Sequence, residues 1–484
     1  MMSPSTRLST RTDDGWSTTR FVVLGFGTAG YACADSLLQA GAEFVTVLDD
    51  RDTEALREKA QILETLGATI KLGPGSTAEL PADVEIVVTS PGIPPHAPLL
   101  ASAVERGIPV WSEIELAWRL RDPANAAPWL CVTGTNGKTT TVQMLTSILT
   151  AAGHRAVAAG NVGLPLLEAV MDPEPYDVIA VELSSYQLHF TDSMSAHSAA
   201  VLNIAPDHVD WHGSLDAYAL AKGKIYENCQ VACVYNVADP ATERLVEDAD
   251  VIEGCRAIGF TLGMPAISMV GLVEDLLVDR AFVEQRASSA LELAGLKDIT
   301  PAAPHNVANA LAAAALARAF GVPATAVRDG LRVFRPDAHR IAHVADVAGV
   351  NYVDDSKATN PHAAQASLLA YEHVVWIAGG QAKGATFDEL VIAAKDRLRG
   401  VVLLGQDKQV IAEALARHAP DVPTITVEAT DTGAMQTVVG EATKLAQVGD
   451  TVLLAPGCAS WDMFANYGAR GDAFAEAVRR LGDH

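Results

Sequence analysis

The sequence predicts an α/β protein of three domains, each with a mainly parallel sheet flanked by helices. Short runs rich in Val, Ile and Leu alternate with helix-like stretches along nearly the whole chain, a pattern typical of parallel strands joined by crossover helices. The length of 484 residues corresponds to about three domains of ordinary size. We expect a Rossmann-like first domain, a central domain like that of P-loop ATPases and a Rossmann-like third domain.

The domains are expected at residues 20–112, 113–336 and 337–484. Residues 1–19 are rich in Ser, Thr and Arg and lack an apolar segment. We therefore interpret them as a disordered tail and not as a secretory signal.

The expected strands follow the chain in order. Those of the first domain are 21–24, 44–48, a short one near 69, 84–88 and 109–111. Those of the second are 129–132, 156–157, 178–181, 199–202, 231–235 and 257–260, and its helices include the alanine-rich 306–319. Those of the third are 350–353, 374–378, 400–404, 424–427 and 450–454. Ligands on such sheets bind beyond the carboxyl ends of the strands.

Composition excludes several classes of protein. Hydrophobic residues make up 49% of the chain and charged residues 19%, as in globular proteins. No apolar run approaches the roughly 20 residues that span a bilayer, and the net charge of −24 argues against nucleic acid as a partner. The six cysteines (33, 131, 229, 233, 255 and 458) have spacings that fit neither a zinc site nor a disulfide framework. We interpret most of them as buried small hydrophobes in a cytoplasmic protein.

The most informative motif is the run Thr-Gly-Thr-Asn-Gly-Lys-Thr-Thr at 133–140, between a predicted strand and a predicted helix. Gly134 and Gly137 allow backbone N–H groups to turn toward phosphate oxygens, and the helix N-terminus adds partial positive charge. Lys138 can reach the β- and γ-phosphates, and the hydroxyl of Thr139 or Thr140 can ligate Mg²⁺. The motif predicts a nucleotide triphosphate site.

This loop departs from the usual pattern at one position. Val132 stands where the usual phosphate loop has its first glycine, so the loop is a shortened variant. The alternative interpretation is a plain turn.

A second glycine loop follows the first strand. Gly25, Gly27 and Gly30 match the dinucleotide fingerprint, with Asp49 or Asp50 about 20 residues on. The same loop could hold any diphosphate-bearing ligand, and a tight strand-to-helix turn is the alternative.

Two polar residues follow strands of the central domain. Glu182 closes the strand after the phosphate loop, where an acidic residue suits a Mg²⁺ ligand but could also cap a helix. His208 follows the next strand and could ligate a metal or contact substrate.

In the third domain, donors follow three strands. Lys357, Thr359 and Asn360 come after the first, Lys383 after the second and Ser460 after the last. Such donors suit a small anionic co-substrate, and Arg340 adds a cation at the domain junction.

Taken in order, these motifs resemble those of the Mur ligase family of ATP-dependent amide-bond-forming enzymes. The resemblance covers about residues 20 to 484. It is carried by the runs at 133–140, 182–187, 203–210, 305–309 and 355–360. The last of these, with Ser90-Pro91-Gly92 and the run at 456–460, points to the branch that adds D-glutamate.

The resemblance implies a role for each region. The N-terminal domain would bind the UDP part of a muropeptide, and Ser184 and Gln187 would face its muramoyl part. The implied UDP-substrate residues are Thr28, Ala29, Asp50, Arg51, Ser90, Pro91, Gly92, Asn161, Ser184 and Gln187. ATP would be held by Gly134, Thr135, Asn136, Gly137, Lys138, Thr139 and Thr140, with Asn306, Asn309, Arg340 and Asp355 completing the site. D-Glutamate would be held by Lys357, Thr359, Lys383, Ser460 and Tyr467.

The resemblance also implies two magnesium ions and a carbamylated lysine that binds one of them. Lys222 fits this position best, and Lys224 is the neighbouring alternative. A carbamate turns a cation into an oxygen ligand suited to Mg²⁺. The implied metal ligands are Thr139, Glu182, His208 and Lys222. The implied catalytic residues are Lys138, Glu182, His208, Lys222, Arg340 and Lys357.

The implied reaction is the ATP-dependent joining of D-glutamate to UDP-N-acetylmuramoyl-L-alanine through an acyl phosphate, performed by a cytoplasmic monomer. Three alternatives remain: another ligase of the same family, an NAD-dependent oxidoreductase based on Gly25 to Gly30, and a non-catalytic nucleotide-binding regulator.

Overall fold

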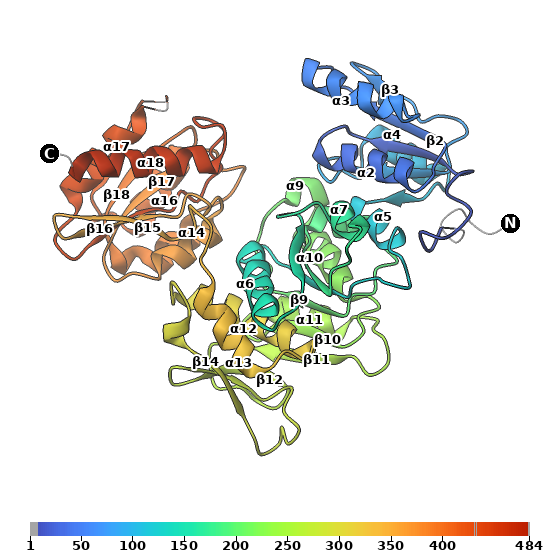
Figure 1. Cartoon of the computed structure of the whole chain (residues 1–484). Coiled ribbons are helices and arrows are strands. Elements are labelled where there is room, and N and C mark those ends of the chain that lie inside the picture. The colour runs from blue at the N-terminus through green and yellow to red at the C-terminus, as the bar shows by residue number, and fades with distance from the viewer. Residues whose placement is uncertain (1–7, 430, 432, 483–484) are drawn as a thin grey trace. The chain divides into compact units, whose positions relative to one another are not determined.

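The computed structural model describes residues 8–429, 431 and 433–482. The chain divides into two compact units, Met1–Ile299 with Asn306–Phe334, and Thr300–His305 with Arg335–His484. The first unit holds a five-stranded and a nine-stranded sheet, and the second holds a six-stranded sheet. Helices flank all three sheets, and the predicted fold class is confirmed (Figure 1). The second unit resumes at Arg335, beside the junction predicted at 336–337.

The first sheet is wholly parallel, in the order β3-β2-β1-β4-β5. Its elements are β1 (Arg20–Leu24), α2 (Thr28–Gln39), β2 (Phe44–Asp49), α3 (Glu54–Thr65), β3 (Thr69–Leu72), β4 (Ile86–Thr89), α4 (Pro98–Glu105) and β5 (Val110–Trp111). Side chains of β1 alternate between two cores: Phe21 and Val23 enter one, Val22 and Leu24 the other. Because both faces are covered, β1 reads as a continuous apolar run.

The expectation of a disordered tail is wrong for residues 8–19; residues 1–7 lie outside the described residues. Leu8 and Trp16 are buried in the core that Phe21 and Val23 enter. Trp16 stacks on Phe21 with ring centroids 5.9 Å apart, and its indole N–H donates to the Thr10 carbonyl. Two large apolar side chains within a polar segment thus supply enough burial to fix it.

The central sheet has the order β14-β13-β12-β11-β10-β9-β6-β8-β7. Its strands are β6 (Trp129–Thr133), β7 (Ala156–Gly160), β8 (Val178–Glu182), β9 (Ser198–Val201), β10 (Ala232–Asn236), β11 (Arg256–Phe260), β12 (Met269–Val273), β13 (Leu276–Asp279) and β14 (Leu291–Gly295). Its helices are α5 (Glu113–Arg119), α6 (Lys138–Ala151), α7 (Leu166–Met171), α8 (Ser185–His189), α9 (Val209–His212), α10 (Leu215–Gly223), η1 (Lys224–Tyr226), α11 (Pro240–Glu247), η2 (Leu296–Asp298), α12 (Pro304–Ala319) and α13 (Ala324–Val333).

The antiparallel end of this sheet was not predicted. Strands β12, β13 and β14 pair antiparallel with one another, whereas β6 to β11 pair in parallel. The turn at Glu274 between β12 and β13 has a positive φ of 56°. The Asp and Glu residues in and beside these strands interrupt the apolar pattern from which strands were predicted.

The C-terminal sheet has the order β15-β16-β20-β17-β18-β19, with β15 antiparallel. Its strands are β15 (Ala342–Val347), β16 (Val350–Asp354), β17 (Val374–Gly379), β18 (Leu398–Leu404), β19 (Thr424–Thr426) and β20 (Thr451–Leu454). Its helices are α14 (Pro361–Leu368), α15 (Asp388–Ala394), η3 (Lys395–Arg397), α16 (Lys408–His418), α17 (Ala434–Leu445) and α18 (Tyr467–Gly482). Along β17, Val374 and Trp376 enter one core while Val375 and Ile377 enter the other.

Within residues 8–429, 431 and 433–482, no helix combines the length and the apolar character that crossing a bilayer requires.

Candidate functional site

The run from 133 to 140 forms a loop between β6 and α6, as predicted. Gly134 has φ 153° and Gly137 φ 86°, values that side chains rarely allow. A Cβ at Gly137 would run into the side chain of Asn309 on α12. The loop therefore places backbone N–H groups and the N-terminus of a 14-residue helix at the carboxyl edge of the sheet.

Side chains from neighbouring strands hold this loop in shape. The Asn136 N–H donates to Asn203 Oδ1 at 2.8 Å, and Asn203 Nδ2 donates back to the Asn136 carbonyl at 3.1 Å. Thr135 Oγ1 lies 3.0 Å from the hydroxyl of Tyr218. Asn203 was not predicted as a site residue. Its position just beyond the end of β9 is the feature of the sequence that could have indicated such a role.

Two lysines converge on the loop. Lys138 Nζ donates to the carbonyls of Gly134 and Thr135 at 2.9 and 3.0 Å. Lys222 Nζ, which is buried, donates to the same Gly134 carbonyl at 2.9 Å. Lys224 instead pairs with Asp192 at 2.8 Å, away from the loop. Of the two candidates for modification, Lys222 is therefore the one that faces the phosphate loop.

The electrostatics of Lys222 favour a neutral amine. Burial, followed by the charge of Lys138, lowers the pKa of Lys222 well below its ordinary value, while Asp207 and Glu182 act in the opposite direction. The charged groups of Lys138, Glu182 and Asp207 are therefore close enough to Lys222 to change its pKa.

Glu182 ends β8 with its side chain 1% exposed. Its Oε1 accepts a hydrogen bond from Asn161 Nδ2 at 2.8 Å, whereas Oε2 is buried and has no hydrogen-bond partner among the described residues. A buried carboxylate oxygen with an open coordination position fits a Mg²⁺ ligand. The alternative role as a helix cap is taken by Ser184, which caps α8.

His208 precedes α9 in a left-handed conformation, with φ 52°. Its Nε2 lies 3.5 Å from Asp207 Oδ2, and its ring lies 4.8 Å from that of Tyr186, in the segment after Glu182. The remaining predicted nucleotide residues of this unit are buried near the N-termini of α6 and α12: Thr139, Thr140, Asn306 and Asn309.

Two residues predicted to face the muropeptide also take part in the local fold. Ser184 and Gln187 form a reciprocal capping box at the start of α8. Gln187 is buried and also donates to Glu113 Oε1 at 2.8 Å. Its amide oxygen accepts the Ser184 N–H and one of its two N–H donors is used, and the expected role of Gln187 at the muropeptide stays a prediction. Asn161, expected at the UDP-substrate, lies against Glu182.

At the carboxyl edge of the first sheet, Arg51 is fixed by Asp49. The guanidinium forms a two-point contact with the Asp49 carboxylate at 3.0 and 2.7 Å, and Asp49 Oδ2 also accepts the Phe26 N–H at 2.6 Å. Asp49 thereby joins the glycine loop to the arginine and is not free for a ribose. Asp50 accepts from Thr77.

The other predicted residues of this edge surround the same loop. Thr28 and Ala29 form the first turn of α2, where backbone N–H groups lack helical partners. Ser90 Oγ donates to the Gly25 carbonyl at 3.3 Å, and a Cβ at Gly25 would collide with Ser90. Pro91 and Gly92 continue the turn after β4.

In the second unit, the loops after β16, β17 and β20 are hydrogen-bonded to one another. Gln381 and Ala459 exchange two backbone bonds, and the Gly457 N–H donates to the Ala358 carbonyl. Buried Arg470 of α18 donates to the Ser356 and Cys458 carbonyls at 2.8 and 3.0 Å. The role of Arg470 was not predicted because a lone arginine in a helical stretch is usually a surface residue.

The predicted donors of this unit lie on these joined loops. Lys357 Nζ lies 3.9 Å from the ring centroid of Tyr467, and exposed Lys383 lies 4.5 Å from that of Trp461. Thr359 is half-buried and Ser460 is buried. The arrangement presents two lysines over aromatic rings beside hydroxyl groups.

Asp355 and Arg340 lie on the same side of this domain. Asp355 accepts a short hydrogen bond from Ser367 and another from the Ile341 N–H at 3.3 Å. Burial raises the pKa of Asp355 to about 7, and the charge of Arg340 acts to lower it.

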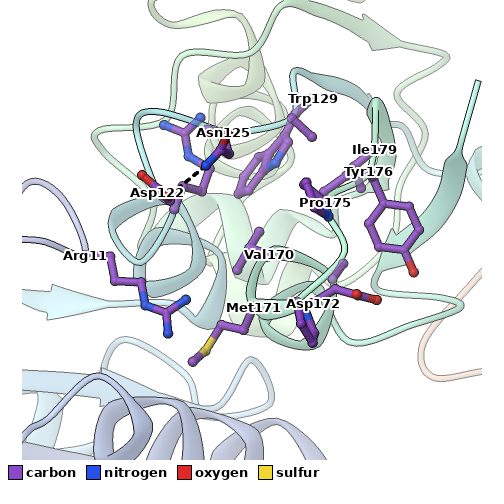
Figure 2. A pocket seen from close by; sticks show the side chains of 15 residues that line it. Arg11, Asp122, Asn125, Trp129, Val170, Met171, Asp172, Pro175, Tyr176 and Ile179 are labelled. Carbon is purple, nitrogen blue, oxygen red and sulfur yellow. Dashed lines mark hydrogen bonds between the residues drawn. The ribbon is translucent and has the colours of Figure 1, made fainter.

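A cavity of about 310 Å³ lies elsewhere (Figure 2). Its lining includes Trp129 and Ile179, at the amino ends of β6 and β8, together with Arg11, Arg121 and Tyr176. The phosphate loop and Glu182 lie at the opposite, carboxyl ends of those strands, where ligands bind on parallel sheets. Cavity size therefore does not identify the candidate site.

Comparisons with known proteins agree along the chain. Residues 19–112 match the model of a Mur ligase MurD-like N-terminal domain, residues 132–317 that of the Mur ligase middle domain, and residues 339–458 that of the Mur ligase glutamate ligase domain. The chain belongs to the Mur ligase family. The resemblance inferred from the motifs is confirmed.

Relatives within this Mur ligase family carry one name. The UDP-N-acetylmuramoylalanine–D-glutamate ligase of Streptomyces avermitilis is 66% identical over 96% of this chain and 99% of its own length. That of Thermobifida fusca is 56% identical over 96% and 98%. A pseudomurein peptide ligase type C from Methanothermus fervidus has a TM-score of 0.57 at 17% identity, over 96% of this chain and 100% of its own, and supports the fold alone.

Proposed function

We propose that this Mur ligase joins D-glutamate to UDP-N-acetylmuramoyl-L-alanine at the expense of ATP, in the synthesis of peptidoglycan precursors. The observation that carries the proposal is the convergence of Lys138, Lys222 and Glu182 on one phosphate loop. The relatives from Streptomyces avermitilis and Thermobifida fusca, which are 66% and 56% identical to this chain, are named for this activity.

The phosphate loop supplies the grip on ATP. The backbone N–H of Gly137 and the ammonium of Lys138 would contact the phosphates, while Asn136, whose N–H is donated to Asn203, shapes the loop around them. Asn203 holds this loop in shape through its two hydrogen bonds with the backbone of Asn136. Asn306 and Asn309, and in the other unit Arg340 and Asp355, are the proposed remaining nucleotide residues.

Glu182, His208 and Thr139 would hold Mg²⁺. The unpartnered Oε2 of Glu182 is the structural feature that fits the ion. When bound, Mg²⁺ would offset the negative charge that develops on the phosphate oxygens. Asn161 orients the carboxylate through Oε1, which leaves the other oxygen for the metal.

Lys222 is the proposed site of carbamylation, and its product would be a ligand of a second Mg²⁺. The amine must be neutral to attack CO₂, and burial beside Lys138 favours that form. The amine nitrogen attacks the carbon of CO₂, one C=O π bond becomes a C–O⁻ group, and one amine proton passes to solvent. The resulting carbamate is an anion that attracts Lys138.

The two outer sites bind the other substrates. Arg51 and the first turn of α2 offer hydrogen-bond donors suited to a diphosphate, with Thr28, Ala29, Asp50, Ser90, Pro91 and Gly92 around them. Lys357 and Lys383, with Thr359, Ser460 and Tyr467, would hold the two carboxylates of D-glutamate.

The chemistry follows from the need for a leaving group. The substrate carboxylate attacks the γ-phosphorus of ATP, ADP leaves, and an acyl phosphate forms. The D-glutamate amine then adds to the acyl carbon and expels phosphate. Lys138 stabilises the transferring phosphoryl group, and a water-excluding site protects the acyl phosphate from hydrolysis.

An amino-acid panel tests the proposal. With ATP, Mg²⁺ and UDP-N-acetylmuramoyl-L-alanine, phosphate release should depend on D-glutamate. Turnover with meso-diaminopimelate or L-lysine instead would assign the chain to another branch of the family. NAD(H) stabilisation in a thermal-shift assay would favour the oxidoreductase alternative, and full turnover by Lys138→Ala would favour a non-catalytic nucleotide-binding role.

We further propose that the protein acts as a cytoplasmic monomer without a membrane or nucleic-acid partner. Light scattering at micromolar concentration should return the mass of one chain.

A further inference from the structure

Three cysteines that play no part in the proposed ligase reaction meet in the central domain. Cys229 follows η1, Cys233 lies in β10, and Cys255 immediately precedes β11. β10 and β11 pair in parallel with Cys233 opposite Ala257, which brings Cys255 to the same place. The spacing of these residues in sequence gave no sign of this cluster.

The sulfur atoms are close enough to share one ion. Cys233 Sγ and Cys255 Sγ are 3.7 Å apart. All three Sγ atoms lie within 4.8 Å of one another. Three thiolates around one zinc ion, each at about 2.3 Å, lie about 4 Å from one another. The cluster therefore has the dimensions of a three-thiolate site.

Burial distinguishes this cluster from cysteines that lie close together by chance on the surface. Cys229 and Cys233 are buried, whereas Cys255 is half-exposed and gives an ion a path from solvent. Carboxylate and carbonyl ligands suit magnesium, whereas thiolates select thiophilic ions.

We propose that Cys229, Cys233 and Cys255 bind a thiophilic metal ion of the zinc class, separate from the magnesium chemistry of the phosphate loop. Each S–H bond breaks as an S–metal bond forms, and three protons pass to solvent. No oxidation is involved. A fourth position would be filled by water through the open side at Cys255.

Cd²⁺ is a suitable probe because cadmium–thiolate bonds absorb in the ultraviolet. Reduced, metal-free full-length protein in excess Mg²⁺ should develop this absorption and saturate at one equivalent of Cd²⁺. Excess Mg²⁺ occupies the oxygen ligands of the Glu182 site, and oxygen-bound Cd²⁺ lacks the thiolate band. Binding should also raise the melting temperature and release protons into a weak buffer.

Two variants complete the test. Cys255→Ser removes the half-exposed ligand and should weaken Cd²⁺ binding on the order of 100-fold or more, since loss of an outer partner alone costs 10–100-fold. Cys33→Ala removes a buried thiol outside the cluster and should leave binding unchanged. Equal melting temperatures of the metal-free variants and wild type would show that folding is retained; Cys233→Ala is the second variant if Cys255→Ser does not fold.

The proposal is overturned if no thiolate band appears at one equivalent of Cd²⁺, or if the band is equally strong in Cys255→Ser. It is also overturned if air oxidation of metal-free protein consumes two thiols and Cd²⁺ fails to protect them, because that outcome indicates a disulfide pair. A ligase rate unaffected by these variants is expected, since none of the three cysteines contacts the phosphate loop.

Discussion

Replacing Arg470 with Met should loosen the proposed D-glutamate pocket without touching a proposed substrate contact. The guanidinium is 1% exposed and donates to the carbonyls of Ser356 and Cys458 and to the Ser356 hydroxyl. It thus joins the loop that carries Lys357 to the loop that carries Ser460. Methionine retains much of the apolar stem but makes none of these bonds.

The expected loss follows from the number of bonds. Each buried carbonyl that loses its donor costs about 1–3 kcal/mol. Burial of the guanidinium, which lowers the pKa of Arg470 to about 10, offsets part of this loss. We expect a net destabilisation of the C-terminal domain of about 2–4 kcal/mol. For a domain of this size the melting temperature should fall by about 5–15 °C.

Calorimetry and steady-state kinetics measure both consequences. The transition of the C-terminal domain should move to lower temperature, and KM for D-glutamate should rise more than KM for ATP. Arg479→Met is the matched control because Arg479 is exposed on the same helix. If Arg470→Met and Arg479→Met have the same melting temperature and the same KM for D-glutamate, the reasoning is refuted.

Three further predictions concern other regions. Trp16→Ala should destabilise the first unit by about 3–5 kcal/mol, measured by urea unfolding; an unchanged midpoint would restore the expectation of a disordered tail. Arg51→Met should raise KM for the UDP-substrate about 10–100-fold with little change in kcat, and an unchanged KM would remove Arg51 from that site. Because the pKa of Asp355 is raised to about 7 while an unfolded aspartate titrates near 4, the native state holds more protons between these values. The stability of the nucleotide-free C-terminal domain should therefore fall as the pH rises from about 4 to 7. Asp355→Asn should flatten this dependence, and an equally steep curve would contradict it.

Much of the fold could be predicted because parallel strands buried on both faces are continuous apolar runs. The predicted strand at 374–378 and the observed β17 agree closely for this reason. Antiparallel β12, β13 and β14 were missed because acidic residues within β13 and β14, and directly after β12, break up the apolar runs. β15, a half-exposed edge strand, likewise lacks a continuous apolar run and was not predicted.

The site was predictable where one local motif sets the geometry, as at Gly137 and Lys138. Contacts between distant segments were not. The pairing of Asn203 with Asn136, the hydrogen bond from the Phe26 N–H to Asp49 and the meeting of three cysteines all depend on strand order. A residue type and its spacing carry no information about such neighbours.

The most direct test of the central claim follows the oxygen atoms. UDP-N-acetylmuramoyl-L-alanine labelled with ¹⁸O in its carboxylate should be turned over with D-glutamate, ATP and Mg²⁺, and the released phosphate analysed by mass spectrometry. Transfer of the terminal phosphoryl group to the carboxylate predicts that one ¹⁸O atom appears in each phosphate. Unlabelled phosphate, or no phosphate at all, would contradict it.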